Sequence, residues 1–571
     1  MGARDLLPWL VFLLLAGCAL SSPAADRAAS EAARAAPEPE KTIVVGQLNA
    51  TKSYGPWDFG QVGGGGAGLA EVHTVALVTE DLHGGLEPRL AAALPSFEQS
   101  TIVVLPDGRM RTTWKLRPNV KWHDGAPFTA EDIEFSFAVA RDPELLAGGT
   151  ANSAYAQLES MEAVDPLTAV ATWRTVSSQA IALGWRELWP FPKHLLGEAF
   201  QDKDMFRAMP YFTTEYIHLG PFRLVDFGLG EQQVFRRFED YFLSRPRVNT
   251  IILRTIPNGN TLLANLKAGT VDVAPDRTLS SEIALRLRDE WQESGEGLVL
   301  HRQDAWVHAS FQFDPQFAQP VELSRDVRLR RGLGYAFDRE AIREFALPGI
   351  SDTSADTLLL ARDRRNEIAG QPFARYRFDP TRAVQELGAG GWQRAADGRM
   401  VNAAGRHMQI QVRVEDERWQ QEVALVADYW RRIGIDAAEY MPSRALARDR
   451  EHRAAFPGTT VRARGVADRV FAGYDGRLQA TAQNRWQGPN LAHYANPALD
   501  SLIDRLYATL DEREQGLIFK DMMEIFATDA PVLPLYYAAS FGVVRKGVHA
   551  LQYDFAVVGG TARNAHLWDR A

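Results

Sequence analysis

The sequence predicts a mixed α/β protein, because strand and helix patterns alternate along most of its length. Val307 to Phe313 ("VHASFQF") and Met408 to Val414 ("MQIQVRV") alternate apolar and polar residues, which is the pattern of half-buried strands. Helix starts are marked at Asp379-Pro380 and Asn496-Pro497, where a capping side chain precedes a proline at the first helical position. Strands and helices interleaved in this way are typical of α/β folds.

The first residues have the layout of a secretory signal. Arg4 precedes an apolar run, Leu6 to Ala16, which is too short to cross a bilayer as a permanent helix. Cys18, the only cysteine of the chain, follows this run directly after two small residues. The sequence "LAGC" that ends at Cys18 resembles the bacterial lipobox, in which cleavage leaves the cysteine as a lipidated N-terminus. We expect residues 1–17 to be a lipoprotein signal peptide; the alternative is an ordinary signal peptide with an incidental cysteine.

A flexible tether is expected over residues 18–40. Ala19 to Lys41 is rich in alanine, serine, proline and glutamate and has almost nothing to bury. No later segment approaches the roughly 18 apolar residues of a transmembrane helix. The net charge of −9 argues against a nucleic-acid partner, and 571 residues with 46% hydrophobic side chains can form several domains. A single cysteine leaves no disulfide within the chain.

Two helices near the C-terminus and one in the middle of the chain have marked boundaries. After Asn496-Pro497, apolar residues recur at helical spacing, and a further helix is expected after Asp511, with Glu514 in the capping-box position. For the helix that begins after Asp379-Pro380, we predict that Gly388 is the stop.

The sequence contains no motif that identifies a catalytic, metal or cofactor site. "HDG" at His123 to Gly125 lacks a second histidine at ligand spacing and is more typical of a turn. "QVGGGGAG", Gln61 to Gly68, lacks the lysine and hydroxyl of a phosphate-binding loop, so we expect a flexible loop whose bare backbone allows close approach. No cofactor is expected, and the pattern favours binding over catalysis.

One stretch identifies a family resemblance. Thr112 to Phe137, "TTWKLRPNVKWHDGAPFTAEDIEFSF", predicts a strand, a bend, a short strand, a turn and a helix that Thr129 caps, with Asp132 three residues on. This stretch resembles the signature of family 5 extracellular solute-binding proteins, the peptide, oligopeptide and nickel receptors of ABC importers. The resemblance covers roughly residues 41–550. Further blocks resemble the family in the expected order: Gly220 to Phe242, Asn258 to Pro275, Val327 to Ile342, Phe378 to Trp392, and Asn490 to Ile503.

The resemblance implies the two-lobed periplasmic-binding-protein fold (type II, cluster C) with an extra inserted domain. By motif order, domain I is expected over residues 41–75, 210–305 and 530–571, domain II over 76–209, and domain III over 306–529. Two chain crossings near residues 306 and 530 would form a hinge. "VHASFQF" fits the first crossing and "PVLPLYY", Pro531 to Tyr537, the second. Closure of two lobes around a ligand is a recurring device of binding receptors.

The predicted pocket departs from the family pattern. Peptide-binding members of the family commonly carry an Asp, in a Trp-x-x-Asp-Tyr segment, that pairs with the amino group of the peptide. Here the corresponding region, Phe456 to Gly476, lacks such a segment, and neither Asp468 nor Asp475 can be aligned with it. Instead Arg462 and Arg464 alternate with apolar residues and are predicted to lie on one face of a strand, where they could bind a carboxylate or phosphate. The alternative is that both are solvated or paired with carboxylates of the protein.

Aromatic and amide side chains are candidate walls of the cleft. "YGPWDF" contributes Tyr54 and Trp57, and "NRWQGPN" contributes Asn484 and Trp486. For the two tryptophans, core packing is the alternative.

These observations lead to a functional expectation. The resemblance implies a monomeric substrate-binding lipoprotein of an ABC importer, held in the periplasm or at the cell surface by lipidated Cys18, that captures a peptide or peptide-like solute for a membrane permease. Nickel chelates, opines and glycosides are other solutes of the same fold, so the fold alone does not select the ligand. The alternatives are an exported, tethered hydrolase and a receptor or chaperone without a transport role.

Overall fold

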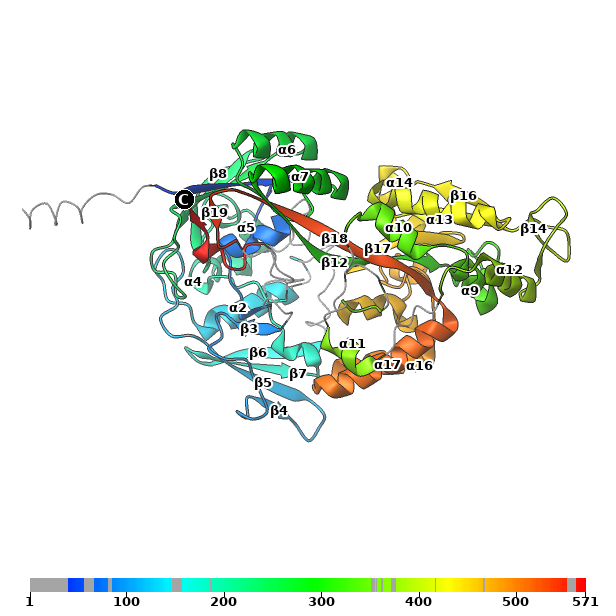
Figure 1. The fold of residues 1–571 in the computed structure, drawn as a ribbon. Helices are drawn as coiled ribbons and strands as arrows, with labels where there is room; N and C mark the ends of the chain where they lie inside the picture. The colour runs from blue at the N-terminus through cyan, green and yellow to red at the C-terminus, as the bar shows by residue number, and fades with distance from the viewer. Residues whose placement is uncertain are drawn as a thin grey trace, which may run out of the picture. The chain divides into compact units, whose positions relative to one another are not determined.

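A mixed sheet of ten strands is the central element of the protein in its computed structural model (Figure 1). The structure describes residues 40–55, 66–80, 85–142, 144–145, 157–184, 187–350, 355, 357–360, 363–370, 376–415, 417–465, 468–551 and 561–571. The sheet lies within the unit Thr42–Ala571, to which the description below is confined. In spatial order its strands are β16 (Asp436–Tyr440), β15 (Gln409–Val414), β17 (Thr459–Gly465), β12 (Gly297–Phe311), β18 (Val532–Arg545), β11 (Val273–Ala274), β1 (Thr42–Gln47), β10 (Thr250–Thr255), β9 (Gln232–Arg237) and β8 (Phe222–Gly228).

Two long strands, β12 and β18, connect the two halves of this sheet. The first half comprises β11, β1, β10, β9 and β8, and the second half comprises β17, β15 and β16. The two long strands pair antiparallel from Gly297 opposite Arg545 to Ser310 opposite Val532. β18 pairs with β11 at one end of this ribbon, and β12 pairs with β17 at the other. The pairing is interrupted between Gln303 and Ala305, and β-bulges of this kind bend and twist a strand. The ribbon is therefore the shared element of the two halves, and its irregular point lies between them.

Helices cover one face of the sheet along both halves (Figure 1). Their apolar residues form a continuous helix-side core, which includes Leu262, Trp291, Leu329, Val426 and Leu533. The helices that contribute to it are α6 (Gly259–Ala268), α7 (Ser281–Ser294), α9 (Val327–Tyr335), α10 (Arg339–Ala346), α12 (Pro380–Ala389) and α13 (Gln420–Arg432).

The other apolar clusters of the large sheet are separate for its two halves. The N-terminal core, with Ile43, Phe235 and Ile251, packs on β1, β9 and β10. The α16–α17 core, with Trp306 and Tyr537, packs the long ribbon against helices α16 (Pro497–Ala508) and α17 (Glu512–Asp529).

A smaller four-stranded sheet forms a separate layer below the first half. Its strands, in spatial order, are β4 (Ile102–Val104), β5 (Met110–Lys115), β7 (Thr168–Trp173) and β6 (Leu158–Asp165). Helix α2 (Ala130–Arg141) packs on it, and residues such as Trp114, Trp122, Ile133 and Trp173 form the small-sheet core.

Short elements complete the described parts of the chain. Three two-stranded pairs join β2 (Val78–Glu80) to β3 (Leu86–Pro88), β13 (Trp392–Arg394) to β14 (Met400–Asn402), and β19 (Val548–His549) to β20 (Asp569–Arg570). The short helices are α4 (Lys193–Leu196), α5 (Lys203–Arg207), α8 (Glu322–Arg325), α11 (Arg364–Ala369), α14 (Arg444–Arg448) and α15 (Arg450–Ala454). The 3-10 helices are η1 (Gly66–Val72), η2 (Ser178–Ile181), η3 (Ala199–Gln201), η4 (Pro210–Phe212), η5 (Glu417–Trp419), η6 (Asp468–Tyr474), η7 (Gly476–Leu478), η8 (Ala482–Asn484) and η9 (Ala565–Leu567).

Most of the predicted element boundaries are confirmed. The predicted segments Val307 to Phe313, Met408 to Val414 and Pro531 to Tyr537 overlap β12, β15 and β18 to within one or two residues at their ends. The residues predicted to cap α2, α12, α16 and α17 stand at their N-caps. The "HDG" stretch is a turn, with Gly125 at a φ of +92° that favours glycine. At α17 only half of the predicted capping box is recorded: the Asp511 carboxylate accepts from the Glu514 backbone N–H.

The predicted stop at Gly388 is wrong. Helix α12 continues to Ala389 and ends at Gly390. A Cβ atom on Gly388 would meet no other atom within 4 Å, whereas one on Gly390 would lie 2.2 Å from a methyl carbon of Leu329. Close packing against α9 therefore requires a glycine at position 390, whereas position 388 has room for a side chain.

Candidate functional site

Strand β17 brings the two predicted arginines onto one face of the sheet. In its antiparallel pairing with β12, Arg462 lies opposite His308 and Arg464 lies opposite Trp306. Val461, before Arg462, lies in the helix-side core, and Ala463, between the two arginines, packs against that core. Trp306 packs in the α16–α17 core. The alternation of apolar and basic residues in β17 thus directs both guanidinium groups to the face opposite the helix-side core.

Glu415 is the carboxylate partner of this arginine pair. It follows β15, which pairs parallel with β17. Its Oε1 lies 2.9 Å from Nη2 of Arg453, and its Oε2 lies 3.6 Å from Nη1 of Arg464. Burial raises the pKa of the Glu415 carboxyl, but the charges of Arg462, Arg464 and Arg453 outweigh it and hold that pKa well below the usual range. Glu415 is therefore ionised and can pair with Arg464. For Arg464, this contact favours the alternative in which the arginine pairs with a carboxylate of the protein.

The arginines outnumber this carboxylate. Arg413, two residues before Glu415 on β15, pairs in register with Thr460 and so lies on the same face as Arg462. We call Arg413, Arg453, Arg462 and Arg464 the arginine cluster; with one glutamate among them, their formal charge is in excess by three.

Two members of the arginine cluster have unsatisfied donors at buried positions. Arg462 is 4% exposed and Arg413 is 3% exposed, and the Nε–H of each has no hydrogen-bond partner among the described residues. Burial lowers the pKa of Arg462 to about 9, with the charge of Glu415 acting in the opposite direction. The guanidinium carbon of Arg462 also lies 5.3 Å from the centre of the Phe456 ring, a cation–π distance. A buried donor without a partner costs the folded protein free energy, because it has lost its hydrogen bonds to water. A bound acceptor would remove this cost.

A neutral histidine completes this face. His308 is fully buried, stacks on Trp306 with ring centres 4.0 Å apart, and has its Nε2 3.4 Å from the hydroxyl of Tyr474. Burial lowers the pKa of His308 well below its ordinary value, and the charges of Arg464 and Arg462 lower it further. His308 therefore adds a polar but uncharged surface beside the cationic one.

A second charged group lies further along β12. Arg302, four residues before Trp306, donates from Nη2 to Oδ2 of Asp276 over 2.7 Å, and both side chains are 7% exposed. A Cβ atom on Gly68 would lie 2.7 Å from Oδ1 of the same carboxylate. The predicted loop is wrong for Gly66 to Gly68, which begin the 3-10 helix η1, although Gly68 does allow a close approach to its backbone. Residues 61–65 lie outside the described part of the chain.

The predicted wall residues are not brought together with the arginine cluster by any recorded contact. Tyr54, 5% exposed, lies in the N-terminal core, stacked on Tyr216 at 4.0 Å and edge-on to His73. Its hydroxyl has no hydrogen-bond partner among the described residues. Trp57 and Cys18 lie outside the described residues.

Asn484 and Trp486 belong to one tightly built loop. Asn484 is exposed, and its side chain accepts from the backbone N–H groups of Thr481 and Gln487 and donates to the carbonyl of Gln479. Trp486 is half-buried beside a small cluster that includes Leu491. Arg485 and Trp486 both have positive φ, at 55° and 59°. Two successive non-glycine residues in this region are strained, and such strain concentrates at functional sites.

The sequence interpretation did not include Glu415, Arg413, Arg453 or His308. The signal for two of them was present, since the alternation of the predicted strand Met408 to Val414 continues to Arg413 and Glu415 on its polar face. The other two come from other elements: the pairing of β12 with β17 places His308, and the ion pair with Glu415 places Arg453 of helix α15. Within the described ranges, no group of three His, Cys, Asp or Glu side chains is placed to hold a metal ion.

Comparison with known proteins identifies the family. The profile of "Bacterial extracellular solute-binding proteins, family 5 Middle" matches residues 86–460, well over half of the chain. The chain belongs to this family. The resemblance seen in the sequence is thereby confirmed.

Relatives of this solute-binding protein are similar along most of their length. The oligopeptide-binding protein AppA of Bacillus subtilis is 20% identical over 522 residues, which cover 88% of this chain and 91% of AppA. The structure of NikZ from Campylobacter jejuni in complex with Ni(L-His) matches with a TM-score of 0.72 at 19% identity, covering 93% of this chain and all of NikZ. The structure of AppA in complex with a nonapeptide matches with a TM-score of 0.67 at 18% identity, covering 94% of this chain and 100% of the AppA chain.

These matches confirm the predicted fold. The mixed α/β architecture is that of the two-lobed periplasmic solute-binding proteins, with β12 and β18 running between the two halves of the sheet (Figure 1). A family of extracellular solute-binding proteins has its place outside the cytoplasmic membrane, and its members bind solutes. None of the helices in the described segments of this chain has the length and apolar character needed to span a bilayer.

Proposed function

We propose that this protein is the substrate-binding component of an ABC importer, which captures a peptide or peptide-like solute and delivers it to a membrane permease. The observation that carries this proposal is the likeness to AppA, an oligopeptide-binding protein, over 88% of the chain. The fold match to AppA holding a nonapeptide supports the same class of solute. The chain is proposed to bind its solute without converting it, since the family and the neighbours are binding proteins.

The three-domain division of the sequence is proposed as the basis of lobe closure. Domain I comprises residues 41–75, 210–305 and 530–571, domain II residues 76–209, and domain III residues 306–529. The proposed crossings near 306 and 530 are supported by the position of β12 and β18, the strands shared by both halves of the large sheet. The pairing irregularity after Gln303 gives this ribbon a place to bend.

The solute is proposed to carry an anionic group that the arginine cluster binds. Arg462 and Arg464 are the proposed contacts, with Arg413 behind them and Glu415 balancing part of the charge. The unsatisfied Nε–H of buried Arg462 supports this assignment, because a carboxylate or phosphate is the acceptor that a guanidinium pairs with best. Tyr54, Trp57, Asn484 and Trp486 remain proposed walls of the cleft.

The protein is proposed to act as a monomer tethered to the membrane in the periplasm or at the cell surface. Lipidation of Cys18 after removal of residues 1–17 would provide the anchor, and residues 18–40 the tether. Three acyl chains on Cys18 bind a bilayer far more strongly than the single chain that gives only marginal attachment. We expect Cys18→Ala to abolish labelling by a palmitate analogue; a labelled Ala variant would contradict the anchor.

Identification of the natural ligand tests the proposed function. The protein is purified from its own host, the small molecules it carries are released by denaturation, and mass spectrometry determines their composition. A peptide or peptide-like acid that rebinds stoichiometrically and is recovered unchanged after prolonged incubation supports the proposal. Conversion of the recovered compound into products would instead favour the exported hydrolase.

A further inference from the structure

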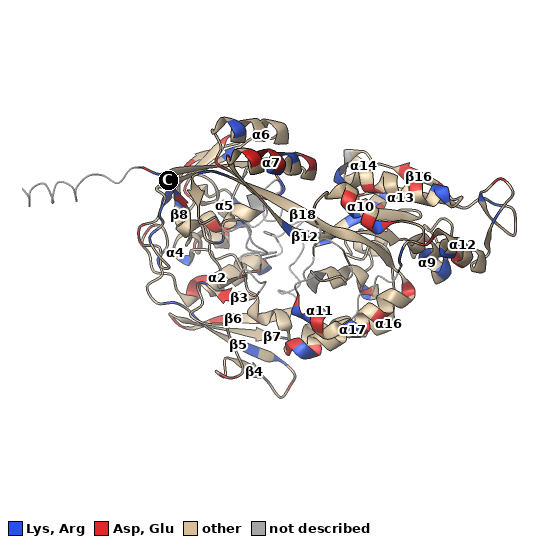
Figure 2. Ribbon diagram, viewed as in Figure 1, with Lys and Arg blue, Asp and Glu red and all other residues tan. Residues whose placement is uncertain are grey.

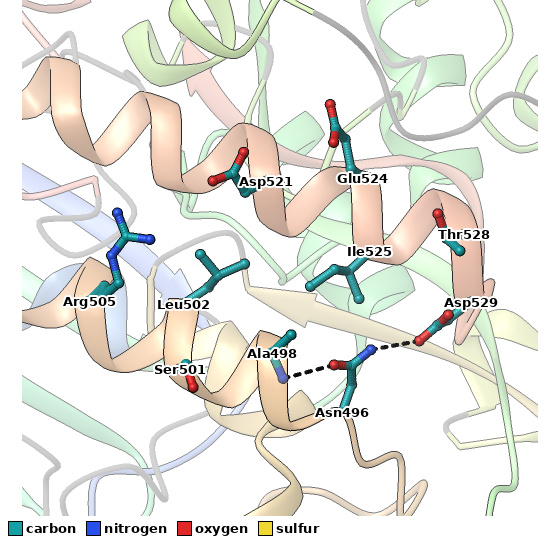
Figure 3. Close-up of a pocket in the computed structure, with 10 residues that line it drawn as sticks. All are labelled: Asn496, Ala498, Ser501, Leu502, Arg505, Asp521, Glu524, Ile525, Thr528 and Asp529. Carbon is teal, nitrogen blue, oxygen red and sulfur yellow. Dashed lines mark hydrogen bonds between the residues drawn. The ribbon is translucent and has the colours of Figure 1, made fainter.

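A surface groove lies between helices α16 and α17, on the second half of the molecule. It has a volume of 580 Å³ (Figure 3). Ten residues line it: Asn496, Ala498, Ser501, Leu502, Arg505, Asp521, Glu524, Ile525, Thr528 and Asp529. The side chains of the arginine cluster are not among them, so the groove is distinct from the proposed solute site.

The groove follows from how the two helices pack. A three-residue connection, Thr509 to Leu510 and Asp511, joins α16 to α17, so the helices run antiparallel as neighbours. Their inner faces meet in the α16–α17 core. On the outer side, Leu502 and Ile525 form an apolar floor, and one end is closed where Asn496 donates to Asp529 over 2.9 Å (Figure 3).

The walls of the groove carry charges that nothing in the described structure neutralises. Asp521 and Glu524 are exposed, three residues apart on α17, and Arg505 is exposed on α16. No hydrogen bond or ion pair of these three side chains occurs among the described residues. Leu517, one turn before Asp521 on the same helix face, is 51% exposed. The ribbon in Figure 2 is coloured red at the acidic residues of both helices. The groove therefore suits a partner that carries basic side chains beside apolar ones.

Helix α16 also lies where the two halves of the protein meet. Besides lining the groove, it contacts the 3-10 helix η2, which precedes the segment leading to α4 in the first half of the chain. Leu510, in the turn between α16 and α17, packs against the small-sheet core. A partner seated in the groove would thus rest on a helix pair that contacts the opposite half, and would be sensitive to whether that contact is made.

We propose that the α16–α17 groove is a docking site for an extracytoplasmic segment of the permease. The segment would place lysine or arginine side chains against Asp521 and Glu524 and an apolar side chain on Leu502 and Ile525. Complementary charges of this kind mainly accelerate association and select the partner. This inference rests on the proposed function, because the permease is the partner that the function supplies.

The test compares two double variants of the full chain that each remove two negative charges from α17. Asp521→Asn with Glu524→Gln, the groove variant, removes the two exposed acidic charges of the groove wall. Glu512→Gln with Glu514→Gln, the control variant, removes two exposed acidic charges outside the groove. Binding to the cognate permease–ATPase complex in lipid nanodiscs is measured by surface plasmon resonance at several salt concentrations. Calorimetry with the co-purified ligand is run on all forms.

The groove variant is expected to bind the transporter with a several-fold higher Kd and a weaker salt dependence, while the control variant matches the wild type. Ligand affinity is expected to be unchanged in both. Equal transporter binding by the two variants would overturn the groove as the docking site and leave the proposed function intact. If the groove variant lost ligand affinity to the same degree as transporter affinity, the groove would also be overturned as a separate docking site. A wild-type protein that binds ligand but no transporter would contradict the proposed function itself.

Discussion

At the scale of single residues, we propose that the buried charges around Glu415 select what this protein binds. One glutamate shares a face of the sheet with three arginines and pairs with a fourth, Arg453 of helix α15. Two of the four arginines keep an Nε–H without a partner among the described residues. The sequence could predict that Arg462 and Arg464 share a face, because strand alternation is a local property. It could not predict their nearness to Arg453, because Arg453 lies on helix α15 and only the tertiary fold brings it to Glu415.

Replacement of Arg462 tests the proposed contact. Arg462→Ala is expected to weaken binding of the co-purified ligand by about 2 to 5 kcal/mol, mostly through faster dissociation, because the anion would lose a desolvated partner. Arg462→Lys should restore only part of this loss, since an ammonium cannot provide the planar fork. Isothermal titration calorimetry measures both, and thermal unfolding of each variant establishes that it is folded. Arg406→Ala, at an exposed position, is the control and should change affinity by less than about 0.5 kcal/mol. A near-neutral Arg462→Ala variant would rule the contact out.

Buried histidines predict a loss of stability in acid. Burial lowers the pKa of His73 to about 3 and that of His123 to about 4, from an ordinary value near 6.5. Their folded-state pKa values are depressed, so the unfolded chain binds more protons between about pH 3 and 6.5, and stability present above pH 6.5 is lost as the pH falls through this window. His73 holds its place through Nδ1, 3.1 Å from the hydroxyl of Tyr216.

Urea unfolding at several pH values measures this effect. Between pH 6.5 and 4, His73→Gln should reduce the pH dependence of the unfolding free energy by up to about 1.4 kcal/mol per pH unit, the contribution of one proton. The same substitution at exposed His407 should leave the slope as in the wild type. Identical slopes for His73→Gln and the wild type would show that His73 is not the group that protonates on unfolding.

At the scale of elements, helix starts were predictable and helix ends less so. The caps at Thr129, Asp379, Asn496 and Asp511 act on their own first turn, so the local sequence suffices to find them. The end of α12 depends on contact with Leu329 of α9, which no local pattern contains. The bulge in β12 and the ten-strand order are equally non-local.

Asp132 ties the first turn of α2 to its surroundings, and its removal should be costly. Its carboxylate accepts from the backbone N–H groups of Thr129 and Lys193, both over 2.9 Å, and from Nε1 of Trp122 over 3.2 Å. Asp132→Ala would leave these donors without their acceptor, so we expect a loss of more than about 2 kcal/mol in the unfolding free energy, measured by urea denaturation. Glu131→Ala removes the neighbouring acid, which makes an exposed ion pair with Lys193, and should cost less than about 1 kcal/mol. Similar losses in the two variants would contradict this account of Asp132.

At the scale of the whole molecule, the account is that two halves of one sheet, joined by β12 and β18, close around a solute. The family and the fold follow from motifs spread over most of the chain, and both are confirmed by comparison. The ligand was not predictable to the same degree, because relatives of the same fold hold a nonapeptide in one case and a nickel–histidine complex in another. We propose that the charge of the arginine cluster selects the ligand of this chain, and that charge is a property of a few side chains.

Small-angle X-ray scattering tests whether the two halves close around a solute. The ligand-stripped protein is measured with and without a saturating concentration of the co-purified ligand. The account predicts a smaller radius of gyration in the bound state for the wild type, because the two halves approach one another when the ligand bridges them. Calorimetry on the same samples establishes saturation. An unchanged radius of gyration at proven saturation would contradict capture of the solute by closure.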